Sequence, residues 1–332
     1  MSRLRIGVIG VGHLGRFHTQ NYAKISSADL TGVYDVDHER SKQVADEYGT
    51  KSYSDMQQLL HDVDAVSLVV PTSLHFETAK TVLESGVHCL IEKPITSTIE
   101  EADALIELAR MNNLIIQIGH IERFNPAILA LRDIKLNPLF VESHRLASFD
   151  PRGTDVAVVL DLMIHDIDII LNLVDSKVKT IDASGVSVLT REVDIANARI
   201  QFENGAVANV TASRISQKKM RKMRLFQQDT YIGIDFLEKI SEIYRLVNAE
   251  ATDNAIFGIP IDIGDPEKKK KIIYQKPNAE EVNALKEELI SFIDCVQNKK
   301  QPIVSGEDGR EALRVAIEIT NLIKTQLQTY GI

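Results

Sequence analysis

Short apolar runs rich in β-branched residues alternate with amphipathic stretches through the first 120 residues of the chain. This alternation is typical of a parallel sheet with helices on both faces. The strands are predicted at residues 5–11, 30–36, 65–70, 87–92 and 114–119. The helices are predicted between them, at 13–24, 38–48, 73–85 and 98–112. We therefore predict a doubly wound α/β domain over residues 1–120.

The pattern changes after Gly119. Helices are predicted at 123–134 and 156–174, and strands at 178–189, 196–202, 206–216, 223–228, 230–236 and within 265–277. Short turns such as Glu203-Asn204-Gly205 join consecutive strands, as in antiparallel hairpins. Helices at 279–298 and 306–327 close the chain. We predict an α+β domain over 121–332 on a large, mostly antiparallel sheet, with C-terminal helices able to pack back on the first domain.

Composition agrees with a two-domain globular protein. The chain has 332 residues, of which 44% are hydrophobic and 26% charged. The formal net charge of -9 argues against nucleic acid or an anionic membrane as a partner. One basic patch, KKMRKMR at 218–224, is expected to be solvated on the outer face of a strand. The alternative is that Arg214 or Arg224 reaches a substrate diphosphate.

Cysteine usage and the N-terminus bear on the compartment. Cys89 and Cys295 lie far apart and belong to no metal-binding spacing, so we expect free buried thiols and no metal. The N-terminal residues do not resemble a signal peptide, and no run of about 18 apolar residues occurs. A cytoplasmic protein is predicted.

A glycine loop, GVGHLG, follows the first strand and opens a helix. Gly10, Gly12 and Gly15 have the G-x-G-x-x-G spacing that suits a dinucleotide pyrophosphate at a helix N-terminus, with His13 and Leu14 lining the same loop. Asp35, at the end of the second strand, would accept hydrogen bonds from ribose hydroxyls and repel a 2'-phosphate, which favours NAD over NADP.

Two alternatives remain at this loop. The glycines could merely form a turn, with Asp35 capping the next helix. Arg40 could reach a 2'-phosphate and so weaken the preference for NAD.

Two further strand ends carry polar residues. In open α/β sheets, ligands bind outside the carboxyl ends of the strands. The third strand ends in VPTSLH, which predicts that Pro71, Thr72 and His75 border the cofactor. The fourth strand ends in Glu92-Lys93-Pro94, and both Glu92 and Lys93 are expected to contact the cofactor at the same edge.

The segment LDLMIHDIDII, at 160–170, carries charges in an apolar helix. On a regular helix Asp161, His165 and Asp168 fall in one narrow sector, while Asp166 points elsewhere. Asp161 and His165 could be a buried ion pair, a cap, or part of an active site. The His-Asp dipeptide also occurs among phosphohydrolase metal ligands. Asp168 is expected to support docking of the helix, and Asp166 to bind a backbone amide or an arginine of the first domain.

The ordered set GVGHLG, VPTSLH, ESGVHCLIEKP and D-x-x-x-H resembles the glucose-fructose oxidoreductase / inositol dehydrogenase / MocA family over essentially the whole chain. The resemblance implies a Rossmann domain followed by a sheet-based domain. It also implies that Lys93, Asp161 and His165 surround the nicotinamide and the reacting carbinol. In such enzymes the second sheet commonly forms a dimer or tetramer, so a homo-oligomer is implied.

Within the family, IGHIERFNPAI (118–128) and DPRGTDVAVVLDLMIHDID (150–168) are similar to the branch of UDP-N-acetylglucosamine 3-dehydrogenases. Arg123, Asn125 and Arg152 then become candidate substrate contacts, together with Lys93, Asp161 and His165. The alternatives are a surface charge for Arg123, a helix N-cap for Asn125 and an ordinary loop charge for Arg152.

The chemistry that these residues suit is oxidation of a secondary alcohol. His165 is the natural base, oriented by Asp161, with Lys93 donating to the substrate oxygen; alternatively Lys93 is the base and His165 positions the hydroxyl. We predict an NAD(P)-dependent dehydrogenase acting at C3 of a UDP-N-acetylhexosamine. The competing hypotheses are a dehydrogenase of a free sugar or polyol such as inositol, and a non-catalytic NAD-binding sensor or scaffold.

Overall fold

The computed structural model describes residues 3–150, 156–250, 256–261 and 269–330. The chain divides into two compact units. The first contains residues 1–124 and 282–314, and the second contains residues 125–281 and 315–332. The long C-terminal helix α9 (Gly306–Tyr330) therefore contributes residues to both units.

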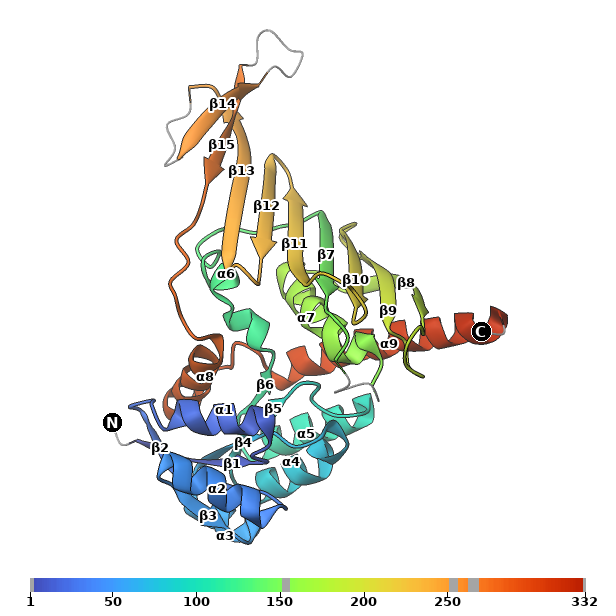
Figure 1. Ribbon diagram of the computed structural model, residues 1–332. Coiled ribbons are helices and arrows are strands. Elements are labelled where there is room, and N and C mark those ends of the chain that lie inside the picture. The colour runs from blue at the N-terminus through green and yellow to red at the C-terminus, as the bar shows by residue number, and fades with distance from the viewer. Residues whose placement is uncertain (1–2, 151–155, 251–255, 262–268, 331–332) are drawn as a thin grey trace. The chain divides into compact units, whose positions relative to one another are not determined.

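The first unit is built on a parallel sheet of six strands in the order β3-β2-β1-β4-β5-β6 (Figure 1). These strands are β1 (Leu4–Ile9), β2 (Ala28–Tyr34), β3 (Lys51–Tyr53), β4 (Ala65–Leu68), β5 (His88–Glu92) and β6 (Ile116–Gly119). The five predicted strands are confirmed. The sequence prediction missed β3, because three residues at a sheet edge are too few to show an alternation.

The helices of this unit are α1 (His13–Tyr22), α2 (His38–Tyr48), α3 (Met56–Asp62), α4 (His75–Glu84), α5 (Ile99–Met111) and α8 (Ala284–Asn298). Their starts follow local capping chemistry: Asp37 caps α2, and Thr98 with Glu101 forms a capping box on α5. The helix α3 was not predicted. On α8, Leu289, Phe292 and Ile293 join the core that contains β1, which explains why residues 282–314 belong to this unit.

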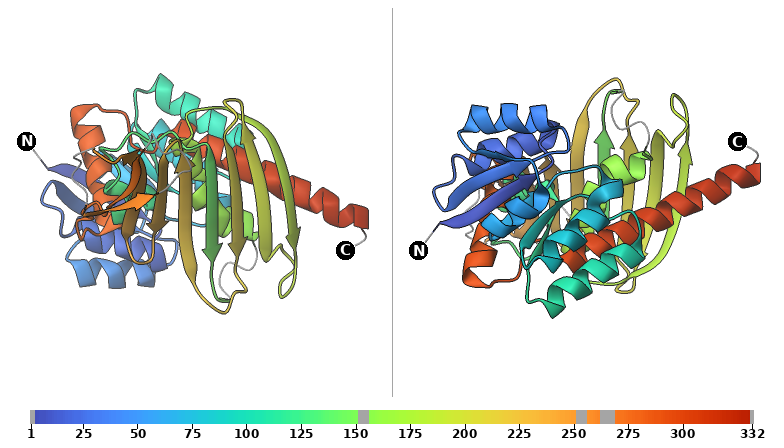
Figure 2. Two further views of the ribbon diagram at one scale, coloured as in Figure 1. Left: turned by 90° about the horizontal axis from the view of Figure 1, so that it is seen from above. Right: turned by 90° about the horizontal axis from the view of Figure 1, so that it is seen from below.

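The second unit is built on nine strands in the order β14-β15-β13-β12-β11-β7-β10-β9-β8 (Figures 1 and 2). Every neighbouring pair is antiparallel except β7 and β10, which are parallel. The strands are β7 (Phe140–Leu146), β8 (Val178–Val186), β9 (Ile195–Phe202), β10 (Val207–Ser213), β11 (Met220–Gln227), β12 (Thr230–Asp235), β13 (Ile240–Asn248), β14 (Phe257–Ile261) and β15 (Lys270–Gln275). The large, mostly antiparallel sheet is thus confirmed, although β7, β13 and β14 were missed.

The predicted helix at 123–134 is largely wrong. A 3₁₀ turn (Ile121–Phe124) is followed by the short helix α6 (Pro126–Leu129). Pro126 disfavours a helical conformation at Asn125, so the two pieces cannot join. Asn125 instead caps α6, with its side chain accepting from the Ala127 amide at 3.0 Å.

The helix predicted at 156–174 consists of two parts. Residues Val159–Met163 form a π-helix and Ile164–Leu173 form α7. The guanidinium of Arg145 on β7 donates to both oxygens of Asp166, at 2.7 and 3.3 Å, and the Ser143 hydroxyl donates at 3.0 Å. The expectation that Asp166 binds an amide or an arginine of the first domain is therefore wrong, because the arginine comes from β7 of the second unit. This buried ion pair holds α7 on one face of the sheet.

Candidate active site

The glycine loop has the geometry of a dinucleotide-binding turn. Gly10 has φ of 84°, which favours glycine, and a Cβ on Gly15 would run into the Gly10 carbonyl. A Cβ on Gly12 would meet no atom of the described residues within 4 Å. Protein packing therefore does not require a glycine at position 12, and the open space fits the close approach of a pyrophosphate. His13 and Leu14 are exposed at the start of α1.

Asp35 lies against the glycine loop. Its carboxylate accepts from the Val11 amide at 2.8 Å and from the Asp37 amide at 2.9 Å. Arg40 contacts Asp35 at 3.3 Å and Asp37 at 3.2 Å. Because Asp37 is the residue that caps α2, the alternative in which Asp35 is the cap is wrong. Asp35 links the end of β2 to the loop after β1, the position expected of a ribose ligand.

His75 connects two strand ends at this edge of the sheet. The buried ring lies 2.8 Å from the Pro94 carbonyl through Nδ1 and 3.0 Å from the Val70 carbonyl through Nε2. Pro71 is exposed and Thr72 half-buried in the turn between β4 and α4. His75 thus supports the backbone that follows β4 and β5, while direct cofactor contact by Pro71, Thr72 or His75 remains a prediction.

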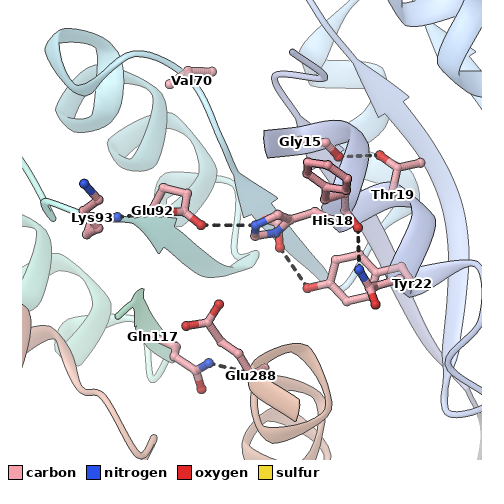
Figure 3. Close-up of polar contacts among 12 residues, drawn as sticks. Gly15, His18, Thr19, Tyr22, Val70, Glu92, Lys93, Gln117 and Glu288 are labelled. Atoms are coloured by element: carbon pink, nitrogen blue, oxygen red, sulfur yellow. Dashed lines mark hydrogen bonds and ion pairs between the residues drawn. The ribbon is translucent and has the colours of Figure 1, made fainter. Parts of the chain in front are cut away.

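Glu92 and Lys93 lie at the end of β5 (Figure 3). One Glu92 oxygen is 3.1 Å from His18 Nε2, and the other accepts from the Lys93 amide at 3.2 Å. Burial favours the neutral acid, but the hydrogen bond and electrostatic effect of His18, and the charge and amide of Lys93, hold the pKa of the Glu92 carboxyl below its ordinary value. His18 was not predicted; the available signal was a histidine on the buried face of α1.

The ERFN segment is buried. Arg123 is only 5% exposed, so the alternative of a surface charge is wrong. Asn125 caps α6 and also donates to the Phe236 carbonyl at 3.2 Å, which confirms the capping alternative. Substrate contact by Arg123 or Asn125 remains a prediction, and Arg152 lies outside the described residues.

Asp161 and His165 belong to the second unit and are half-buried, whereas Asp166 and Asp168 are buried. Asp161 lies in the π-helix and His165 in α7. The wider π turn changes the angular relation that a regular helix predicts for these two side chains. Such turns occur frequently at functional sites. The segment is therefore irregular where the family resemblance assigned catalytic residues.

The basic patch at 218–224 lies at the start of β11. Arg221, Lys222 and Arg224 are exposed while Met223 is buried, so the solvated outer face is confirmed. Arg224 pairs with Glu142 at 3.4 Å. Arg214 is buried and donates to the Val156 carbonyl. The two cysteines are free and buried, as predicted.

Known protein families match both units of the chain. A model described as an oxidoreductase family with an NAD-binding Rossmann fold matches residues 4–120. The GFO/IDH/MocA C-terminal domain model matches residues 141–231. The chain belongs to the Gfo/Idh/MocA family. It is a dehydrogenase with an NAD(P)-binding Rossmann domain, as the motif order predicted.

Individual relatives are similar over their full length. The UDP-N-acetylglucosamine 3-dehydrogenase of Acidithiobacillus ferrooxidans is 40% identical over 99% of this chain and 100% of its own. Its solved structure has a TM-score of 0.87 at 38% identity, covering 98% of this chain and 99% of that one. The scyllo-inositol 2-dehydrogenase (NAD(+)) of Bacillus subtilis is 30% identical over 96% of this chain and 94% of its own. Within the described residues, no helix has the length and apolar character needed to cross a bilayer.

Proposed function

We propose that this enzyme oxidises the C3 hydroxyl of a UDP-N-acetylhexosamine with NAD. The observation that carries the proposal is the 40% identity to a UDP-N-acetylglucosamine 3-dehydrogenase over 99% of the chain. The glycine loop, Asp35 and the Glu92-Lys93 strand end support it from the first unit. The Asp161 and His165 segment supports it from the second.

The proposed chemistry needs a hydride acceptor, which NAD supplies when bound, and a proton acceptor from the chain. The C3–H bond breaks as hydride leaves, the hydroxyl proton passes to the base, and a C3 ketone forms. Either His165, oriented by Asp161, takes this proton while Lys93 donates to the oxygen, or Lys93 takes it and His165 positions the hydroxyl. Arg123 is the buried cation that we assign to the substrate.

We assign NAD rather than NADP because the carboxylate of Asp35, at the end of β2, would accept hydrogen bonds from ribose hydroxyls and repel a 2'-phosphate. Arg40 does not change the assignment, since it already pairs with Asp35 and Asp37.

A homo-oligomer formed through the second sheet is part of the same proposal. Six aromatic rings form a row across six neighbouring strands, with centroid separations of 5.0 to 5.8 Å. They are Phe140, Phe226, Tyr231, Tyr244, Tyr274 and Phe257. Light scattering should give the mass of two or four chains of 37.1 kDa, and the double variant Phe226→Lys/Tyr244→Lys should lower that mass. A single-chain mass for the parent protein would contradict this part.

The test of the activity is NADH formation from UDP-N-acetylglucosamine. The parent protein should produce NADH, and Lys93→Ala with His165→Ala should lower kcat by about 1000-fold or more while the Kd for NAD changes by less than about twofold. No NADH with UDP-sugars, alongside turnover of free inositol or glucose, would favour a polyol dehydrogenase, the alternative supported by the 30% identity to an inositol dehydrogenase. No turnover on a broad sugar panel would favour an NAD sensor.

A further inference from the structure

The buried side chain of His18 makes a contact that has no role in the proposed chemistry. It lies on α1, is 0% exposed, and faces the Glu92 carboxylate at the end of β5 (Figure 3). Because a carboxylate only accepts hydrogen bonds, Nε2 of His18 is the donor. The other ring nitrogen, Nδ1, has no hydrogen-bond partner within the described residues. Within the described residues, the hydrogen bond to Glu92 therefore orients the His18 ring.

The neighbouring strand also accommodates the Glu92 carboxylate. Gly119, the last residue of β6, pairs with Glu92 in the parallel sheet. A Cβ at Gly119 would lie 3.0 Å from both the carboxyl carbon and Oε1 of Glu92. The side chain of Glu92 thus folds back over Gly119 toward His18, into a space that an alanine would narrow. Burial, strand pairing and hydrogen bonding all define one conformation for this carboxylate.

The conformation of the Glu92 carboxylate determines how the backbone of Lys93 is held. The Glu92 oxygen that does not face His18 accepts from the Lys93 amide, and the two side-chain charges attract each other. We propose that His18 and Glu92 are positioning residues for Lys93: His18 fixes one carboxylate oxygen, and the other oxygen then fixes the backbone from which the Lys93 side chain projects. The inference rests on the proposed function, in which Lys93 contacts the substrate oxygen.

A matched control exists on the same helix. Tyr22, one turn after His18, is also buried, and its hydroxyl lies 2.8 Å from the Ser67 hydroxyl. Tyr22→Phe therefore removes a buried hydrogen bond of α1 that does not reach Glu92. If loss of any buried hydrogen bond of this helix disturbed catalysis, Tyr22→Phe and His18→Leu would have similar effects.

The first measurement is steady-state kinetics with UDP-N-acetylglucosamine. His18→Leu and Glu92→Gln should lower kcat by about 10- to 100-fold, since misplacing a reacting group by about 1 Å costs on that order. The Kd for NAD should stay within about twofold in His18→Leu, because this buried residue is assigned to positioning and not to cofactor binding. His18→Gln retains an N–H donor and should recover most of the lost kcat. Tyr22→Phe should have the kcat of the parent protein.

The second measurement does not depend on the substrate. The amine of Lys93 is labelled with trinitrobenzenesulfonate and quantified by mass spectrometry, with the exposed Lys80 as an internal reference. Glu92→Gln should speed labelling of Lys93 by about threefold or more, because the carboxylate that attracts the Lys93 side chain and holds its backbone amide is gone. Labelling in Tyr22→Phe should match the parent protein.

The outcomes separate the two proposals. An inactive parent protein with altered Lys93 labelling in Glu92→Gln would overturn the proposed function and support the positioning contact. Unchanged labelling in Glu92→Gln would overturn the positioning role, whatever the substrate. An active parent protein whose His18→Leu variant turns over as fast as Tyr22→Phe, or is not rescued by His18→Gln, would do the same.

Discussion

In the first unit, Glu92 and Asp35 stand at the ends of parallel strands, where backbone amides and a histidine hold them. In the second unit, Asp166 and Asp194 are less than 2% exposed and lie inside the domain. Arg145 and Ser143 hold Asp166, and three consecutive amides hold Asp194. We infer from the comparison that carboxylates enclosed in the domain serve stability, whereas those at strand ends serve the site: Asp35 as the proposed ribose ligand and Glu92 as the positioning residue for Lys93.

The largest expected effect concerns Asp166. Arg145→Met leaves this carboxylate buried without its guanidinium, which should lower the free energy of unfolding by about 3–5 kcal/mol. Urea unfolding measures the loss. The double variant Arg145→Met/Asp166→Leu should recover much of it, because no unpaired charge remains. A loss below about 1 kcal/mol in the single variant would contradict the conclusion that the enclosed Asp166 carboxylate serves stability.

Asp194 is the next test. Amides of Val188, Leu189 and Thr190 donate to it at 2.7 to 2.9 Å. Burial would raise the pKa of this carboxyl, yet these hydrogen bonds lower it to about 2. The charged form is therefore stabilised by folding, and Asp194→Asn should cost about 2 kcal/mol at neutral pH.

The contribution of Asp194 to the free energy of unfolding should decrease as the pH falls. A depressed pKa contributes stability that is complete above the unfolded value and is lost as the pH falls toward the folded value. The difference between the parent protein and Asp194→Asn should thus be constant at neutral pH and shrink from about pH 4 toward pH 2. A difference that stays constant down to pH 2 would show that the charge of Asp194 does not matter.

For Asp35 we expect the substitution to change NAD affinity, in contrast to Asp166 and Asp194, where it changes stability. Asp35→Asn removes a charged acceptor from the ribose position, so the Kd for NAD should rise about tenfold and the preference over NADP should fall. Titration by calorimetry with both cofactors measures this. Asp37→Asn is the control, since asparagine caps a helix about as well as aspartate. Unchanged NAD affinity in Asp35→Asn would refute the ribose assignment.

The smallest effect is expected for an exposed pair. Lys222 lies 3.0 Å from Asp235, and its side chain is 57% exposed. Lys222→Met should change the free energy of unfolding by at most about 0.5 kcal/mol, because solvent and salt screen such pairs. A loss comparable to that of Arg145→Met would mean that enclosure is not what makes a carboxylate structural.

Much of the fold could be predicted where local patterns are long. The helix α2 begins and ends where the sequence pattern placed it, because Asp37 caps it and Gly49 ends it in a left-handed conformation. The glycine loop was also predictable, since its constraints lie within six residues. Short elements such as β3 and α6 were not, because three or four residues carry too little periodicity.

In the candidate site, too, only features carried by a short stretch of sequence could be predicted. Lys93, Asp161 and His165 were proposed from motifs, whereas the partners of the buried charges were not predicted. Arg145 is 21 residues from Asp166 in the chain, and His18 is 74 residues from Glu92. Nothing in the local sequence around either carboxylate indicates which side chain meets it.

For this protein, the order of residues is enough to specify the parallel domain, the nucleotide loop and the family, because capping, glycine conformation and hydrophobic periodicity act between near neighbours. The pairing of distant groups is not specified in that way. Which cation neutralises Asp166, and which imidazole orients Glu92, depends on strands and helices that come together only on folding. Burial then makes those contacts obligatory, because a charge removed from water requires a partner.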